Sequence, residues 1–212
     1  MSDIFREIDE ELRRDNLLNL WARYGRYIIA VAAVALVVAG GIVAWREHQL
    51  AERRAQSTRY AGALTLARDG KEADAAKVFA AIAEEGGGYA VLASFEEAAL
   101  LAKSGDRSAA IADYDRIAAT DLDPGLRGLA LLLSVMQSLP EAGARQTIER
   151  LAPLTESGNP WRPTALELTA LARLKSGDKS GALDLYKGLA DDLAAPPSLR
   201  ARAAEMAAAL AS

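Results

Sequence analysis

The sequence predicts an all-α protein, in which one N-terminal transmembrane helix precedes an α-solenoid built of repeated helix pairs. Three observations support this fold class. Residues 27–45 form an uncharged apolar run, a glycine-led motif recurs along the chain after it, and alanine and leucine dominate the composition. Alanine and leucine favour helix because they lose little side-chain entropy there.

The composition bounds both the size of the protein and its chemistry. A chain of 212 residues suffices for an anchor and one domain of roughly 150 residues. Lys and Arg number 25 against 29 Asp and Glu, and the resulting net charge of −4 argues against general nucleic-acid binding, which needs a basic surface. The absence of cysteine excludes disulfides, thiolate metal sites and a cysteine nucleophile.

Residues 1–26 are expected to form a cytoplasmic tail with an amphipathic helix. Ile4, Ile8 and Leu12 recur every fourth residue, with Phe5 beside them, which is the spacing of one helical face. Two roles are open for this helix. It could lie on the cytoplasmic surface of a membrane, continuous with the following span, or it could dock a cytoplasmic partner.

Residues 27–45, YIIAVAAVALVVAGGIVAW, are predicted to be the transmembrane helix. Nineteen helical residues extend about 28 Å, close to the roughly 30 Å hydrocarbon core of a bilayer. Tyr27 and Trp45 lie at its ends, where amphipathic rings favour the interface. The alternatives are a buried core helix and a signal peptide cleaved after Val37-Val38-Ala39. A signal peptide fits poorly, because six acidic residues precede the run.

The orientation of the span follows from the layout of the chain rather than from its charges. Four arginines precede the run within about 15 residues and four follow it, so the positive-inside rule does not decide. A short tail, a single span and a large C-terminal domain form the plan of a signal anchor with an exported domain. We therefore expect a single-pass protein of the bacterial inner membrane, with a cytoplasmic N-terminus and a periplasmic C-terminal domain.

The span also contains small residues four positions apart, namely Ala35 with Ala39 and Gly40 with Ala44. Such spacing lets a second transmembrane helix approach closely. Chance is the alternative explanation in a segment this rich in alanine.

Residues 46–55 are expected to be a charged connector, and residues 56–212 a repeat domain. Segments that begin at Gly70, Gly105 and Gly177 share alanine at +5, an aromatic residue at +9, Ile or Leu at +12 and alanine at +13. A degenerate copy between the last two has Leu139 at the glycine position, followed by Ala144, Ile148, Leu151 and Ala152. A period near 34 residues indicates stacked helix–turn–helix units. Ser198 to Leu210 would form a closing helix.

Each motif position has a physical role in such a unit. The glycine ends the first helix in a left-handed conformation. The small alanine at +5 lets the two helices close up, and the aromatic residue at +9 fills the gap to the neighbouring unit. An alanine seven residues before the glycine, at Ala63, Ala98 and Ala170, would receive the partner helix.

The motif resembles the tetratricopeptide repeat, in which the first helix of each pair lines a concave protein-binding groove. This resemblance places the following residues in the groove: Ser57, Tyr60, Leu64, Arg68, Leu92, Phe95, Lys103, Thr164, Glu167 and Lys175. One hypothesis is that Arg68, Lys103 and Lys175 form a positive ladder for acidic groups or a C-terminus, with Tyr60 and Phe95 as apolar anchors. The alternative is that these cations only meet helix dipoles.

No catalytic or cofactor site is expected. His48 is the single histidine and cannot form a metal cluster. Gly86-Gly87-Gly88 lacks the lysine and hydroxyl residue of a phosphate loop. An enzyme is therefore the least favoured function class, and we expect no small-molecule substrate.

Four sequence features carry a second resemblance, which covers about residue 22 to the end. They are Gly25-Arg26 before the span, Gly41 and Trp45-Arg46 at its close, YAVLASFE at 89–96 and KSGDKSGA at 175–182. In this order they resemble the YfgM-like family of ancillary subunits of the bacterial Sec translocon. Membership would imply protein partners, namely translocon subunits, periplasmic chaperones or exported chains. A repeat scaffold for another envelope machine, such as cell-wall synthesis or outer-membrane assembly, is the alternative.

Overall fold

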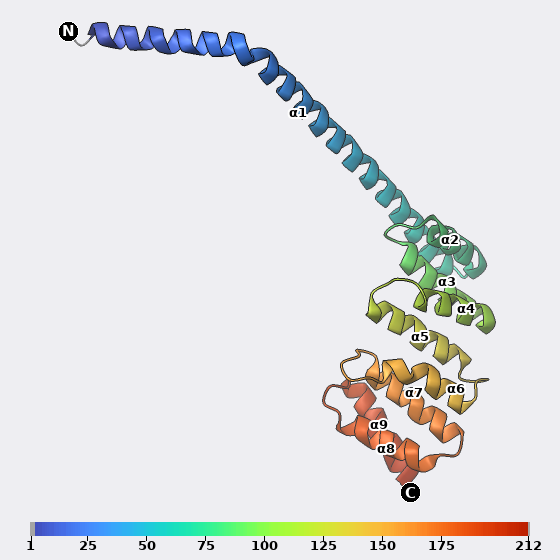
Figure 1. Cartoon of the computed structure of the whole chain (residues 1–212). Helices are drawn as coiled ribbons and strands as arrows, with labels where there is room; N and C mark the ends of the chain where they lie inside the picture. The colour runs from blue at the N-terminus through green and yellow to red at the C-terminus, as the bar shows by residue number, and fades with distance from the viewer. Residues whose placement is uncertain (1–2, 212) are drawn as a thin grey trace. The chain divides into compact units, whose positions relative to one another are not determined.

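The computed structural model describes residues 3–211, and the side chains of residues 23–27, 29–31 and 33–211. Within this described part every regular element is helical, which confirms the predicted all-α class (Figure 1). The chain divides into two compact units, Met1–Ala55 and Gln56–Ser212. Helix α1 (Asp3–Arg68) runs through the first unit, and its last turns belong to the second.

The first unit contains the apolar run. Between Arg23 and Arg68, α1 meets the length and composition needed to cross a membrane, and none of its most apolar window is buried. Ile29, Leu36 and Trp45 are each at least 60% exposed, whereas the core helix of a soluble domain is mostly buried. The amphipathic face expected in the tail falls on side chains outside the described ones, and the boundaries of tail, span and connector stay predictions.

The second unit is a succession of helix pairs closed by one further helix (Figure 1). The last turns of α1 and helix α2 form the first pair, in which Ala63 shares a buried cluster with Ala75 and Phe79. Each second helix also packs on the first helix of the next pair. The helices are α2 (Glu72–Glu85), α3 (Ala90–Ser104), α4 (Arg107–Ala118), α5 (Pro124–Ser138), α6 (Ala144–Leu151), α7 (Arg162–Lys175), α8 (Lys179–Asp191) and α9 (Pro197–Ala211), with a 3₁₀ turn, η1 (Ala152–Leu154), after α6.

The turns within the pairs depend on glycine and aspartate. Gly70, Gly105 and Gly177 have φ values of 78°, 91° and 88°, which confirms the predicted left-handed helix ends. In two turns an aspartate then caps the next helix: Asp106 accepts a hydrogen bond from the Ala109 N–H, and Asp178 accepts one from the Gly181 N–H.

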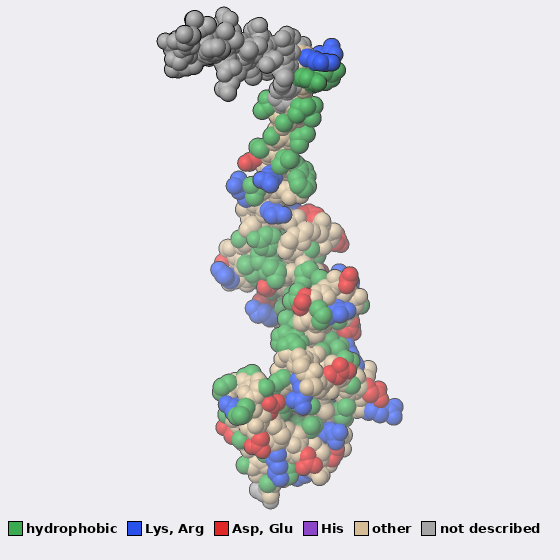
Figure 2. Space-filling model, turned by 60° about the vertical axis from the view of Figure 1, so that its left-hand side comes forward, with side chains coloured by type: hydrophobic (Ala, Val, Ile, Leu, Met, Phe, Trp, Pro, Cys, Tyr) green, Lys and Arg blue, Asp and Glu red, His purple; other side chains and the backbone are tan. Residues whose placement is uncertain are grey.

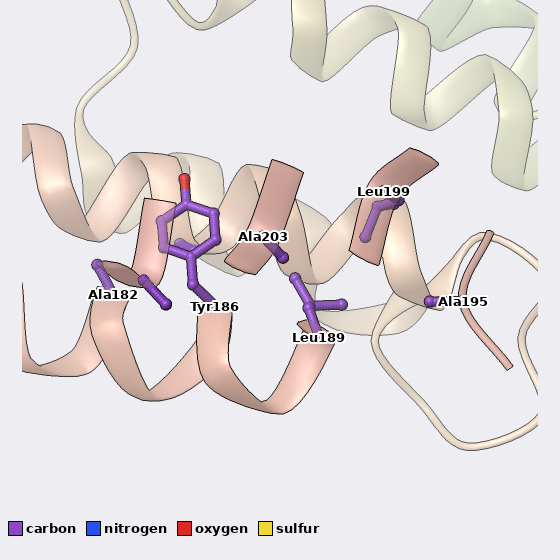
Figure 3. Packing of buried hydrophobic residues seen from close by; sticks show 8 residues of the cluster. Ala182, Tyr186, Leu189, Ala195, Leu199 and Ala203 are labelled. Carbon is purple, nitrogen blue, oxygen red and sulfur yellow. The ribbon is translucent and has the colours of Figure 1, made fainter. Parts of the chain in front are cut away.

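The core is formed by the motif positions. Ala75, Ala110 and Ala182 are fully buried, which confirms that the +5 position lies between helices. The aromatic residues at +9, Phe79, Tyr114 and Tyr186, are at most 3% exposed. Figure 3 shows this packing between α8 and α9, where Tyr186 and Leu189 of α8 face Leu199 and Ala203 of α9. Helix α9 thereby closes the C-terminal end of the domain, as predicted.

The predicted register of the third repeat was wrong by three residues. Ala144 and Ile148 are only half-buried, and Ala152 is exposed. Thr147, Leu151 and Leu154 occupy the buried positions, at 2%, 0% and 4% exposure. Leu139 lacks the freedom of glycine and stays right-handed with φ −48°, so the chain needs a longer turn before α6 begins. That longer turn shifts every later position of the repeat.

Candidate protein-binding groove

The first helices of the four pairs can be compared position by position, aligned on Gly70, Gly105, Leu139 and Gly177. Leu92, in the first turn of α3, is 49% exposed. Its equivalent in α5 is Leu126, which is 37% exposed. The equivalent in α7 is Thr164, which is half-buried, and in α1 it is Ser57, also half-buried. Two adjacent first helices therefore present leucines to solvent at the same position.

The three basic residues near the ends of the first helices have different surroundings. Arg68 is exposed at the end of α1. Lys103 forms an ion pair of 2.6 Å with Glu72 of the preceding pair. The Lys175 ammonium donates hydrogen bonds to the carbonyl oxygens of Leu139 (2.7 Å) and Pro140 (2.9 Å). Lys103 and Lys175 thus link adjacent repeats, which supports a stabilising role near helix ends while leaving the binding role a prediction.

The two expected aromatic anchors pack within the domain. The Tyr60 ring lies 5.3 Å from that of Phe79 and 5.2 Å from that of Tyr89, centroid to centroid. Its hydroxyl donates to Glu96 at 3.4 Å. Burial, together with the Glu96 carboxylate, raises the pKa of Tyr60 above its usual value. Phe95 is half-buried, 6.2 Å from the ring of Tyr114.

Two further groove candidates also serve the packing of the domain. Leu64 is half-buried in the cluster around Phe79. Glu167 accepts two hydrogen bonds from the Arg202 guanidinium, at 3.0 and 2.9 Å, and so fastens α7 to the closing helix α9. Such a two-point contact is geometrically specific and stronger than a single neutral hydrogen bond.

Two exposed leucines were not among the predicted groove residues. Leu126 belongs to the degenerate third repeat, from which no groove residue was predicted, although alignment on Leu139 would have found it. Leu171 of α7 is 42% exposed, one turn before Lys175. It lines a shallow, mainly apolar hollow of about 410 Å³ together with Leu139, Pro140, Ala172, Leu174 and Lys175. The solvent-facing side of the first helices is therefore more apolar than the predicted ladder of positive charge.

The charge of the repeat domain is mixed. Figure 2 shows Lys and Arg interspersed with Asp and Glu over the visible face of the domain, and hydrophobic side chains between them. Partly buried Glu97 of α3 lies among these charges. Burial raises the pKa of the Glu97 carboxyl above its usual value, Asp113 raises it further, and Arg116 opposes the rise.

The part of the chain whose side chains are described contains no group of three or more His, Asp or Glu side chains that could hold a metal ion. His48 is exposed, and its Nε2 lies 3.2 Å from the Glu52 carboxylate one helical turn later. This arrangement is ordinary for neighbouring side chains on a helix surface.

The helix pairs and their motif agree with a known family. The family model of the tetratricopeptide repeat-like domain matches residues 19–152, more than half of the chain. The chain belongs to this family. The matched region contains the apolar run of α1 as well as the first pairs, so the family's pattern includes both.

Comparison with a solved structure supports the same fold. The crystal structure of a kinesin light chain candidate from Podospora anserina, with nearly identical TPR-like repeats, is similar to this chain with a TM-score of 0.54. The match covers 72% of this chain and 83% of the other at 14% identity, and therefore concerns the fold alone. Among curated proteins, none matches this sequence. A tetratricopeptide repeat-like scaffold supports protein–protein interaction as the class of function.

Proposed function

We propose that this tetratricopeptide repeat-like protein is a single-pass protein of the bacterial inner membrane whose periplasmic repeat domain binds other proteins. The observation that carries the proposal is the helix α1. Its apolar run is uncharged and unburied, and it continues into the first helix of a repeat scaffold within one family match. The tail before the run would then be cytoplasmic.

The partners we propose are Sec translocon subunits, envelope chaperones or the exported chains they handle. The order of Gly25-Arg26, Trp45-Arg46 and the motifs at 89–96 and 175–182 supports this choice through the resemblance to the YfgM-like family. The exposed leucines Leu92, Leu126 and Leu171 are consistent with it. Newly exported chains still expose apolar side chains, and burying these against leucine contributes roughly 25 cal/mol per Å².

The small residues of the span would serve the same assembly. Ala35, Ala39, Gly40 and Ala44 lie in α1 with the spacing that lets a second transmembrane helix approach its backbone. We propose that they contact a helix of a membrane-embedded partner.

A topology experiment tests the anchor and the orientation. A reporter that is active only after export should be active when fused after Ser212 and inactive when fused at Met1. The chain should keep its full mass in the membrane fraction, because the anchor is not cleaved. A cytoplasmic signal from the C-terminal fusion would contradict the proposed location, and loss of the first ~39 residues would identify a signal peptide.

Co-purification from membranes in mild detergent tests both the partner and the groove. A variant with Arg68, Lys103 and Lys175 changed to Gln removes three charges from the first helices. A matched control changes three basic residues to Gln that are exposed on second helices, namely Arg107, Arg145 and Lys187. If these three cations bind the partner, translocon or chaperone subunits are lost with the first variant only, and added salt weakens the wild-type complex. A slightly lower melting temperature with the partner retained would leave only the structural role.

A second pair of variants separates an apolar groove from a basic one. Leu92→Asp and Leu126→Asp place charges at exposed positions, where folding tolerates them. We expect partner recovery to fall, because each carboxylate must be desolvated against an apolar chain. Leu193→Asp, at the 86% exposed α8–α9 turn, is the control. Recovery of cell-wall or outer-membrane assembly proteins instead of translocon subunits would assign the scaffold to another machine.

A further inference from the structure

The first helix pair has an open apolar hollow on its surface. It measures about 540 Å³ and lies between the last turns of α1 and helix α2. Gly62, Ala63 and Leu66 line it from α1, and Val78 and Ala81 from α2. Ala63 is only 1% exposed and forms the floor.

The two ends of the solenoid differ in this respect. Each helix pair exposes an apolar face that its neighbour covers, so the terminal units of a solenoid need a cap. At the C-terminal end α9 provides the cap, burying Leu199, Ala203 and Ala207. At the first pair the hollow between α1 and α2 stays open among the described residues.

The charges at the edges of the hollow indicate what could cover it. At one end Arg59 pairs with Glu85, and at the other Lys77 lies 3.8 Å from Asp74. All four side chains are exposed. Each end thus carries one cation and one anion, which disfavours a partner whose surface is strongly positive or strongly negative. A surface with the same mixture can match it, because cations of one copy meet anions of the other.

We propose that this face binds the same face of a second copy of the chain, and that the protein is a dimer. A two-fold interface uses one self-complementary patch on both subunits. Gly62 favours close approach, because a Cβ built there meets nothing within 4 Å and the space is free for a side chain of the partner copy. The proposal rests on the membrane anchor in one respect: anchored copies share one orientation and a raised effective concentration.

Cysteine cross-linking in native membranes tests the dimer, because the full-length chain has no cysteine of its own. Gly62→Cys and Ala81→Cys introduce a thiol at the hollow. Leu193→Cys and Ala204→Cys are the controls, since both positions are exposed in the C-terminal part of the domain. With a short bismaleimide, we expect a product of twice the chain's mass at Gly62 or Ala81 and none at the controls. Absence of that product at both positions, or a product containing a different protein, would overturn the proposal.

Two double variants test whether the hollow itself makes the contact. Each combines Ala81→Cys with a change at Gly62. Gly62→Trp fills it, and Gly62→Ala leaves it open. Neither is expected to harm folding, because Gly62 lies in a helix with open space at its Cβ. The Ala81→Cys product should be lost with Gly62→Trp and retained with Gly62→Ala; an unchanged product with Gly62→Trp would refute the site. The variants are scored in whichever fraction holds the protein, so a failure of anchoring is seen separately from a failure of dimerisation.

Discussion

Replacing Ala110 by leucine tests the repeat packing most directly. Ala110 of α4 is fully buried, in a cluster with Ala98 of α3, Tyr114 of α4 and Ala130 of α5. The three additional carbon atoms of leucine have no free space at this junction of three helices. Overpacking of this kind costs about 1–3 kcal/mol. For a chain of this size each kcal/mol lowers the melting temperature by about 2–4 °C, so a decrease of roughly 2–12 °C is expected.

The assay is thermal unfolding of the detergent-solubilised chain, followed by far-UV circular dichroism. Ala112→Leu is the matched control, because Ala112 is exposed on the same helix. Alanine and leucine differ by only a few tenths of a kcal/mol in helix propensity, so this control should melt near the wild type. Equal melting temperatures for Ala110→Leu and Ala112→Leu would refute the packing argument for the +5 position.

Two further predictions concern the stability of the folded domain. One compares two glycine positions, and the other compares one variant at two pH values. Gly105→Ala should destabilise the domain by about 1 kcal/mol, because φ is 91° there, whereas Gly188→Ala on the exposed side of α8 should stabilise it by about 0.5–1 kcal/mol; equal shifts in urea unfolding would contradict this. Glu97→Gln should raise the melting temperature at neutral pH. The pKa of Glu97 is raised in the folded state, so its ionised form opposes folding, and the gain should shrink as pH falls toward its usual value of 4.5. A gain that is the same at pH 7 and pH 4 would refute this cause.

Most of the fold could be predicted because its signals are local. The left-handed glycines and the buried alanines each follow from one residue type at a fixed spacing. The third repeat shows where this reasoning fails. Leu139 replaces a glycine, so the chain turns over more residues before α6, and sequence spacing no longer gives the register. Thr147 then fills a buried place that alanine holds in the other repeats, and no hydrophobic pattern marks it.

The groove was harder to predict, because exposure depends on neighbours that are distant in sequence. Tyr60 and Phe95 occupy first-helix positions, yet contacts with Phe79, Tyr89 and Tyr114 place them against the core. Glu167 accepts a hydrogen bond from Arg202, which lies 35 residues later in the sequence. Only the packed domain shows that Leu92, Leu126 and Leu171 stay exposed while larger aromatic residues do not.

The contacts of the basic residues also constrain how a ligand could use them. An ammonium group has three N–H donors, and Lys175 already directs hydrogen bonds to two carbonyl oxygens. An acidic ligand can therefore approach it without breaking those contacts. Lys103 must share its charge with Glu72, in a pair whose lysine is exposed and whose glutamate is half-buried. A ligand carboxylate should consequently prefer Lys175 to Lys103, because Lys175 lies beside the hollow lined by Leu171, where an apolar side chain can be buried at the same time.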